Sequence, residues 1–216
     1  SMGIYVFETR RLLELLAEDA ADAASTHDFG HDIIPALVRE GRAAAHSFSR
    51  SCVMTGGERA PYWRDVGTID SFWRANLDLC ALEPELDIYS ADWPIWTHTE
   101  LTPPAKFVHD EAGRRGMAVS SLVSGGCIVS GSRVDTSLLF TGVHCHSYSG
   151  LTRVVALPYA SVQRHAQLTD VVLDRGVEIP EGMVIGADPE ADAARFRVTE
   201  GGVTLVTRAM IDALAG

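Results

Sequence analysis

The stretch that decides the fold runs from residue 122 to residue 185, and its middle part, residues 139–157, reads LFTGVHCHSYSGLTRVVAL. Apolar residues recur along it at intervals of six, interrupted by intervals of five. Such hexapeptide spacing is typical of a parallel β-helix, in which each short flat side contributes one inward residue and the stacked coils bury a continuous core. The predicted inward residues are Leu122, Ile128, Val134, Leu139, Cys145, Leu151, Leu157, Val162, Leu168, Leu173, Ile179 and Ile185.

The hexapeptide version of this fold is left-handed, which departs from the usual handedness of parallel crossovers. About sixty residues make roughly three or four coils, and a solenoid this short needs a cap. We expect that cap to be a hairpin over residues 196–207, turning at Glu200, Gly201 and Gly202, followed by an amphipathic end over residues 208–214. The β-helix domain is therefore placed at residues 119–216, and its exposed end offers a surface for another subunit.

The preceding residues read as alternating strands and helices. Residues 4–7 and 43–53 are predicted strands, and residues 9–19, 31–40 and 69–80 are predicted helices, the second capped by Asp28 and ended by Gly41. This pattern predicts an α/β layer over residues 1–82, in which Trp73 belongs to the apolar face of its helix. Residues 83–118 are rich in Pro, Trp and Asp with little periodicity, and are predicted to be a linker with local order.

Residues 62–68, YWRDVGT, place chemistry directly before the third helix. Unpaired backbone N–H groups at a helix start favour an anion, and Asp65 offers the carboxylate oxygen that Mg²⁺ prefers. Trp63 can lay an apolar ring face against a sugar or a base. The alternative is an ordinary corner, with Trp63 in the core, Asp65 or Thr68 capping the helix, and Arg64 paired at the surface.

This motif belongs to a set that extends in register from residue 1 to about residue 214. The other members are SMGIYVF at 1–7, HDFG at 27–30, PPAKF at 103–107, SGGC at 124–127 and IPEGMVIG at 179–186. In order and spacing they closely resemble bacterial glucose-1-phosphate adenylyltransferase, also called ADP-glucose pyrophosphorylase. The resemblance covers the carboxyl-terminal half of that family's chain, whose Gly-rich nucleotide loop lies in the other half.

The resemblance implies a fold and an activity. Residues 1–82 are expected to be part of a Rossmann-like nucleotidyltransferase domain. The family makes ADP-glucose and pyrophosphate from ATP and glucose 1-phosphate, with Mg²⁺ offsetting charge. Without the ATP-binding half, the 216 residues by themselves are expected to be inactive. By position, Asp65 resembles the second metal ligand of the catalytic site and Trp63 a wall of the sugar pocket. The remaining glucose contacts implied by the resemblance are Ser1, Tyr5, Asp28 and Phe29, although Tyr5 and Phe29 equally suit a core.

The resemblance also implies regulation and assembly. The family is homotetrameric and binds anionic effectors by arginines between the catalytic domain and the β-helix, and Arg175 and Arg208 match such positions. Some bacterial members carry a second basic residue one turn after Arg208, where this chain has Asp212. This charge reversal should weaken a bisphosphate effector. Surface pairing is the alternative for both arginines.

Composition sets the class of partner. Acidic residues outnumber basic ones, 29 to 18, for a formal charge of −11. The absence of a basic cluster argues against nucleic acid or an anionic membrane as the partner. The four cysteines are far apart without a C-x-x-C pair, and there is neither a membrane-length apolar run nor a signal peptide, so we expect a reducing, cytoplasmic location.

Two other functions stay open from the sequence. One is a non-catalytic module that mediates oligomerisation and effector binding. The other is a hexapeptide-repeat acyltransferase, which would need a catalytic histidine on a coil, for which His144, His146 or His165 are candidates. His144 and His146 share a face of their coil, but two ligands without a third are a weak metal site.

Overall fold

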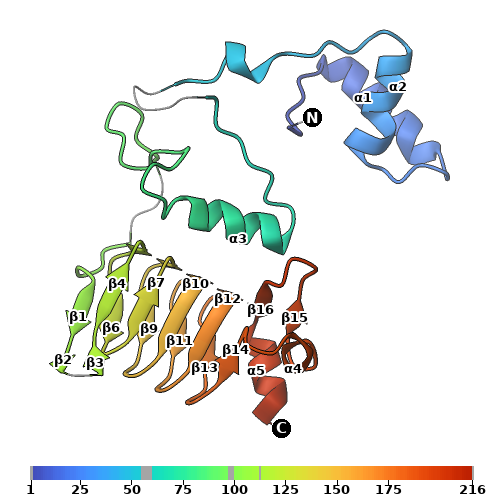
Figure 1. The fold of residues 1–216 in the computed structure, drawn as a ribbon. Coiled ribbons are helices and arrows are strands. Elements are labelled where there is room, and N and C mark those ends of the chain that lie inside the picture. The colour runs from blue at the N-terminus through green and yellow to red at the C-terminus, as the bar shows by residue number, and fades with distance from the viewer. Residues whose placement is uncertain (1, 55–59, 97–99, 112, 216) are drawn as a thin grey trace. The chain divides into compact units, whose positions relative to one another are not determined.

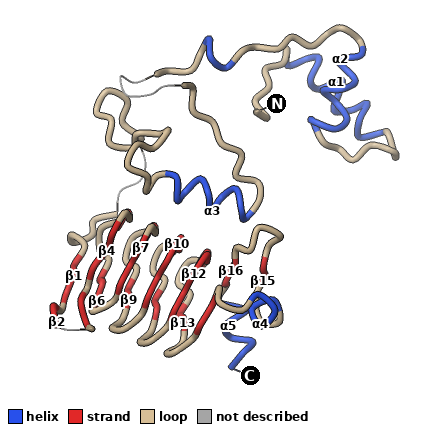
Figure 2. The backbone as a smooth tube through the Cα atoms, in the orientation of Figure 1, coloured by secondary structure: helices blue, strands red, loops and turns tan. Residues whose placement is uncertain are grey.

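The computed structural model describes residues 2–54, 60–96, 100–111 and 113–215. By its internal contacts the chain divides into two compact units, Ser1–Val53 and Met54–Gly216. Figure 1 follows the elements in chain order, and Figure 2 shows that the strands of the described chain all lie in the second unit.

The first unit is helical. It contains helix α1 (Thr9–Ala21), a π-helical turn (Phe29–Ile33) that runs into helix α2 (Ile34–Arg39), and a 3₁₀ turn (Phe48–Arg50). Its small core joins Leu15, Ile33 and Leu37, with Phe7 and Phe29 packed against them. As predicted, the Asp28 side chain caps the second helical segment by accepting a hydrogen bond from the backbone N–H of His31, at 2.9 Å.

The two strands predicted in this unit are wrong. Residues 4–7 and 43–53 contain no strand, and the side chains of Ile4 and Val6 are 75% and 97% exposed. A strand exists through its hydrogen bonds to a neighbouring strand, and the described residues of this unit contain no partner strand. The predicted helix at 31–40 also differs, because its first turn is π-helical and begins at Phe29.

The second unit is built on a parallel β-helix, as the hexapeptide spacing predicts. One sheet has the strand order β1-β6-β9-β11-β13, and a second follows β15-β16-β12-β10-β7-β4, with β5, β8 and β14 attached. The strands are β1 (Lys106–Val108), β2 (Asp110–Glu111), β3 (Arg114–Arg115), β4 (Met117–Val119), β5 (Leu122–Val123), β6 (Ile128–Ser130), β7 (Arg133–Asp135), β8 (Leu138–Leu139), β9 (His144–Cys145), β10 (Gly150–Ala156), β11 (Ser161–Val162), β12 (Gln167–Leu173), β13 (Glu178–Ile179), β14 (Val184–Ile185), β15 (Arg197–Val198) and β16 (Thr204–Val206).

The solenoid starts earlier than residue 119. Strand β1 pairs in parallel with β6, and β4 pairs in parallel with β7. Residues 106–108 and 117–118, which the sequence places in the linker, therefore belong to its first strands. These strands form the open end of the stack, where Phe107 is 45% exposed. Positions in an end coil need not all be buried, so the hexapeptide spacing of apolar residues is weak there.

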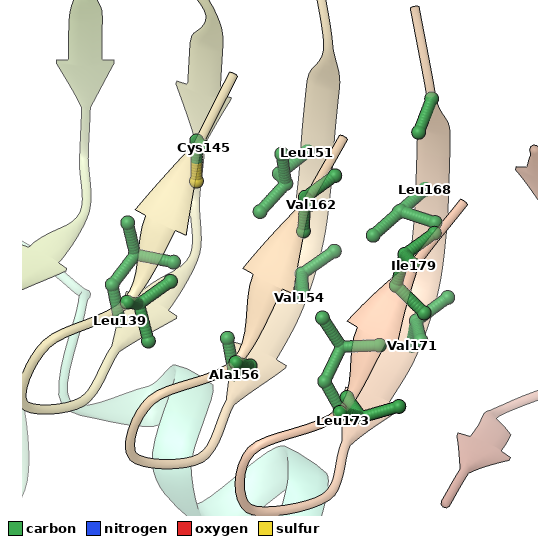
Figure 3. Packing of buried hydrophobic residues seen from close by; sticks show 14 of the residues in the cluster. Leu139, Cys145, Leu151, Val154, Ala156, Val162, Leu168, Val171, Leu173 and Ile179 are labelled. Carbon is green, nitrogen blue, oxygen red and sulfur yellow. The ribbon is translucent and has the colours of Figure 1, made fainter. Parts of the chain in front are cut away.

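The core is built on three inward stacks, with Val154 and Val171 packed beside them (Figure 3). The paired positions are Val129, Cys145, Val162 and Ile179 in one, Ala118, Val134, Leu151, Leu168 and Ile185 in the second, and Val123, Leu139, Ala156, Leu173 and Val206 in the third.

Nine of the twelve predicted inward residues occupy these stacks. The other three, Leu122, Ile128 and Leu157, are half-buried, and the inward position belongs to the neighbour, Val123, Val129 or Ala156. Since side chains alternate between faces, an error of one residue exchanges inside for outside.

The predicted cap is confirmed. Strands β15 and β16 form an antiparallel hairpin, and helix α5 (Arg208–Ala215) follows it. A short helix, α4 (Pro189–Ala193), precedes the hairpin, and its buried Asp192 accepts a hydrogen bond from the backbone N–H of Gly186 at 2.6 Å. Position 186 needs glycine, because its φ is +87° and a Cβ would lie 1.8 Å from the carbonyl oxygen of Thr169.

Helix α3 (Ile69–Asp78) covers the third side of the solenoid. The outward residues Val155, Val172 and Val203 are buried beneath an apolar layer formed by Ile69, Phe72, Trp73, Leu77, Phe140 and Leu205. The indole N–H of Trp73 donates to the carbonyl oxygen of Arg153 at 2.8 Å, which agrees with the prediction that Trp73 is a packing residue. Within the described ranges, no helix has both the length and the apolar character needed to cross a membrane.

Candidate functional site

The loop that carries the predicted metal ligand runs straight into α3. The hydroxyl oxygen of Thr68 accepts the backbone N–H of Ser71 at 3.1 Å, so Thr68 is the helix cap. Arg64 donates to the Glu85 carboxylate at 2.8 Å, and its guanidinium carbon lies 5.6 Å from the centre of the Tyr62 ring. Two parts of the ordinary-corner interpretation are therefore correct, namely the cap at Thr68 and the surface pairing of Arg64.

Trp63 does not fit that interpretation. Trp63 is 42% exposed, so it is not a core residue. Asp65 is exposed, and its Oδ1 accepts the backbone N–H of Gly67 at 2.9 Å, which closes a local turn instead of capping α3. The loop thus presents an exposed carboxylate and an exposed indole within three positions of each other.

Three of the other predicted sugar contacts come together in the first unit. The rings of Tyr5 and Phe29 are stacked, with centroids 6.0 Å apart and planes inclined by 19°. A Cβ built on Gly30 would lie 3.2 Å from Asp28 Oδ1 and 3.9 Å from the Tyr5 hydroxyl, so both polar groups flank this glycine. Ser1, the remaining predicted contact, lies outside the described residues.

A second polar group stands beside this cluster. His27, whose φ is +59°, places Nδ1 2.9 Å from the carboxylate of Asp19. Hydrogen bonds from Ser25 and His27 hold the pKa of Asp19 below its ordinary value. The predicted site residues are divided between the two units. The first unit holds Tyr5, Asp28 and Phe29, and the second holds Trp63 and Asp65.

The two predicted effector arginines meet at one corner of the solenoid. Arg208 donates from Nη2 to the carbonyl oxygen of Gly176 at 2.8 Å. Arg175, the residue before that glycine, lies over the Tyr159 ring with its guanidinium carbon 5.2 Å from the centroid. Tyr159 in turn donates to the carboxylate of Glu100, which with burial raises the pKa of the Tyr159 phenol. The corner therefore joins the start of α5 to the turn after β12.

Sequence reasoning missed Tyr159 and Glu100 at this corner. Tyr159 sits at a coil corner with a φ of +64°, a conformation that favours glycine, and its ring covers the glycine of the preceding coil, Gly142. The sequence does carry one usable signal, because Tyr159 directly follows Pro158 between two predicted inward positions. Glu100 gives none, because it reaches the corner from a segment without periodicity.

The histidine pair is arranged for stacking. The rings of His144 and His146 lie 3.9 Å apart at 28°, so they share a face as predicted, and burial together with the charge of His146 lowers the pKa of His144. His165 stacks on Tyr148 at a coil corner, 4.9 Å between centroids. Across the residues that the structure covers, no group of three or more His, Cys, Asp or Glu is placed to hold a metal ion.

Two protein families match the chain in sequence. Residues 1–81 match the nucleotidyl transferase family, and residues 103–206 match the GlmU-like C-terminal hexapeptide family. Helix α3 belongs to the first match and packs on the solenoid of the second. The two matches together define part of a nucleotidyltransferase that carries a hexapeptide β-helix.

Similar curated proteins narrow this class. The chain is 62% identical over 214 residues to the glucose-1-phosphate adenylyltransferase of Rhodopseudomonas palustris strain BisB18, an alignment of 99% of this chain and 51% of that protein. It is 64% identical over 215 residues to the enzyme of that name from Cereibacter sphaeroides (100% and 51%) and 60% identical over 214 residues to that from Agrobacterium fabrum (99% and 51%). The chain belongs to the glucose-1-phosphate adenylyltransferase family. It spans about half the length of the curated relatives that it matches.

Proposed function

We propose that this chain is part of an enzyme that makes ADP-glucose and pyrophosphate from ATP and glucose 1-phosphate for glycogen synthesis. The observation that carries the proposal is the identity of 60% or more to glucose-1-phosphate adenylyltransferases over nearly the whole chain. A reaction at phosphorus depends mostly on positioning and on stabilising charge, which a fixed carboxylate and a shaped sugar pocket supply. The match of residues 1–81 to nucleotidyl transferases favours this proposal over a hexapeptide-repeat acyltransferase, in which those residues have no part.

The sugar side is assigned to the residues named above. Trp63 offers an exposed ring face, and the Tyr5–Phe29 stack beside Asp28 combines an apolar surface with hydrogen-bonding groups. We propose that these residues, with Ser1, contact the glucose unit. The support is the family resemblance, the exposure of Trp63, and the grouping of Tyr5, Asp28 and Phe29 within the first unit.

We propose Mg²⁺ as the cofactor, with Asp65 as one of its ligands. Mg²⁺ is usually bound by one or two carboxylates together with substrate phosphates and water, so a single exposed carboxylate fits such a site. When bound, the ion would offset the charge of the reacting phosphates. The part played by this chain is to hold Asp65 in place, through the turn to Gly67 and the cap at Thr68.

The 216 residues alone are expected to turn over little or no substrate, because the Gly-rich loop that holds ATP in this family is not among them. The test is pyrophosphate release from ATP, glucose 1-phosphate and Mg²⁺, measured for this chain and for a fusion in which the amino-terminal half of the Rhodopseudomonas palustris relative precedes residue 1. We call that fusion the fused enzyme. It is expected to form ADP-glucose. A folded fused enzyme that makes no ADP-glucose would contradict the proposed function, and turnover by the 216 residues alone would contradict the need for a second half.

We further propose that Arg175 and Arg208 bind an anionic effector and that the enzyme is a homotetramer in the cytoplasm. Two guanidinium groups at one corner suit an anion, and the cysteines Cys52, Cys80, Cys127 and Cys145 are all unbridged, as in a reducing compartment. A non-catalytic regulatory and oligomerisation module is the competing assignment. It predicts oligomers in light scattering and no ADP-glucose from the fused enzyme.

Reversing the charge at Asp212 tests the effector site. Asp212 follows Arg208 by one turn of α5, so its carboxylate opposes a bisphosphate at that corner. In the fused enzyme, Asp212→Arg is expected to lower the fructose 1,6-bisphosphate concentration for half-maximal activation by roughly tenfold. The reason is that a carboxylate that repels the bisphosphate is replaced by a guanidinium that attracts it. Asp212→Ala should give a smaller shift in the same direction. An unchanged activation curve in both variants would contradict this assignment of the corner.

A further inference from the structure

The hairpin that closes the solenoid touches the first turn of α3 through a polar contact. The hydroxyl of Thr199, between β15 and β16, donates to Oδ1 of Asp70 at 2.7 Å. The same hydroxyl oxygen accepts the backbone N–H of Val203 at 3.0 Å, and the backbone N–H of Thr199 donates to the carbonyl oxygen of Val203 at 3.0 Å. Thr199 is therefore fixed by its own hairpin before it reaches Asp70.

The turn of the hairpin is shaped to fit this carboxylate. A Cβ built on Gly201 would lie 2.2 Å from Oδ1 of Asp70, so a side chain at this position would displace one of the two elements. Both Asp70 and Thr199 are half-buried, and Val203 packs under Ile69 and the neighbouring aromatic residues of α3. The apolar contact fixes the helix against the sheet, and the polar contact fixes its position along the hairpin.

Asp70 lies five positions after Asp65, and the intervening residues are already constrained. The backbone N–H of Gly67 is bound to Asp65 and that of Ser71 to Thr68, so two hydrogen-bonded turns follow each other directly between Asp65 and the first turn of α3. A displacement of the first turn of α3 would therefore be passed to the Asp65 carboxylate. In catalysis by positioning, a shift of about 1 Å in a reacting or ligating group costs up to roughly 10²-fold in rate.

We infer that Asp70 is a positioning residue, held by Thr199, which sets the place of the Asp65 carboxylate for the reaction. This inference rests on the proposed function, because it assigns Asp65 to the metal. It gives the β-helix cap a part in catalysis, since a residue 129 positions later in the chain fixes the start of the helix that follows the metal-ligand loop.

The variants separate the hydrogen bond from other effects. Thr199→Val keeps the shape but removes both the donor to Asp70 and the acceptor of the Val203 backbone N–H, whereas Thr199→Ser keeps both and Asp70→Ala leaves the hairpin bond intact. Asp70→Ala removes the acceptor, whereas Asp70→Asn keeps an acceptor oxygen and loses the charge. In the fused enzyme we expect Thr199→Val and Asp70→Ala to lower kcat about tenfold and to raise the Mg²⁺ concentration for half-maximal activity about threefold to tenfold. We expect the KM for ATP to stay unchanged, and Thr199→Ser and Asp70→Asn to remain within about threefold of the unaltered enzyme in kcat.

Amide hydrogen exchange in the 216-residue chain gives a readout that does not depend on activity. Thr199→Val and Asp70→Ala should speed exchange at Gly67 and Ser71 about fivefold or more and leave the amides of β10 and β12 unchanged. If the fused enzyme makes no ADP-glucose, the proposed function fails, and the exchange still decides whether the contact holds the loop. The inference would be overturned if exchange at Gly67 and Ser71 stayed unchanged. It would also be overturned if the melting temperature fell while kcat and the Mg²⁺ dependence stayed the same, because a purely structural contact gives that second result.

Discussion

Replacing Asp65 with asparagine is expected to lower the kcat of the fused enzyme by at least about 10²-fold, the scale on which removal of one group that stabilises transition-state charge is felt. Asparagine keeps the shape of the side chain and an acceptor oxygen for the Gly67 backbone N–H, so the turn stays closed. What it loses is the negative charge that, in the proposed assignment, attracts Mg²⁺. Because Asp65 is exposed, the melting temperature should change little.

The control for Asp65→Asn is Asp78→Asn, at the end of α3, where the carboxylate lies 3.6 Å from Arg64. It removes the same charge from the same helix–loop segment, and we expect kcat within about twofold of the unaltered enzyme, as for an exposed ion pair. Raising the Mg²⁺ concentration should restore part of the activity of Asp65→Asn, because the site is weakened and not deleted. A fused enzyme with Asp65→Asn that keeps full kcat and an unchanged Mg²⁺ dependence would remove Asp65 from the metal site.

The solenoid was predictable because its signal is local and repeated. Each coil repeats the same spacing, so the cap hairpin and most of the inward stacks follow from the sequence. The errors arise where a small residue holds the inward position, as Ala156 does beside Leu157. From the sequence, the inward position is assigned to the larger apolar neighbour, although the alternation of side chains along a strand puts that neighbour on the opposite face.

The covering of the third side by α3 also had a signal that was missed. Val154–Val155 and Val171–Val172 are paired apolar residues in which one member faces the core and the other faces α3. Consecutive apolar residues in a strand indicate burial on both faces. In a solenoid this pattern predicts a covering element.

Pairing in the first unit was not predictable in the same way. Residues 4–7 have strand-forming composition, whereas residues 43–53 are rich in Ala and Ser. A strand also requires a neighbour, and helix contacts are local where strand contacts are not. The candidate site shows the same division. The loop at Asp65 was found from residue types before a helix, whereas the sugar contacts came from family resemblance, because Tyr5 and Phe29 alone do not differ from a small core.

The stability of the solenoid is expected to fall with rising pH above about 9, and Cys145 is expected to be a main cause. Cys145 is fully buried in the first inward stack, and burial, with a smaller contribution from Cys127, raises its pKa from 9.0 to about 12. In the unfolded chain the thiol releases its proton near pH 9.0, whereas the folded chain keeps it, so above that pH the unfolded state binds fewer protons. The stabilisation is therefore complete below pH 9 and declines as the pH rises towards 12.

The free energy of unfolding attributable to Cys145 should fall by roughly 2–3 kcal/mol between pH 8 and pH 11, as two pKa units are worth about 2.7 kcal/mol. Urea unfolding under reducing conditions, followed by the β-sheet circular dichroism signal, measures it in the unaltered chain and in Cys145→Ala. The alanine variant has a lower free energy of unfolding at pH 8. Between pH 8 and pH 11, however, its free energy of unfolding should fall by about 2–3 kcal/mol less than that of the unaltered chain. Val162→Ala is the matched control, because Val162 pairs with Cys145 in the next coil and is equally buried. It opens a comparable space and keeps the thiol, so it should lower stability equally at both pH values. Equal pH slopes in all three chains would mean that the Cys145 thiol reaches water or ionises in the folded core.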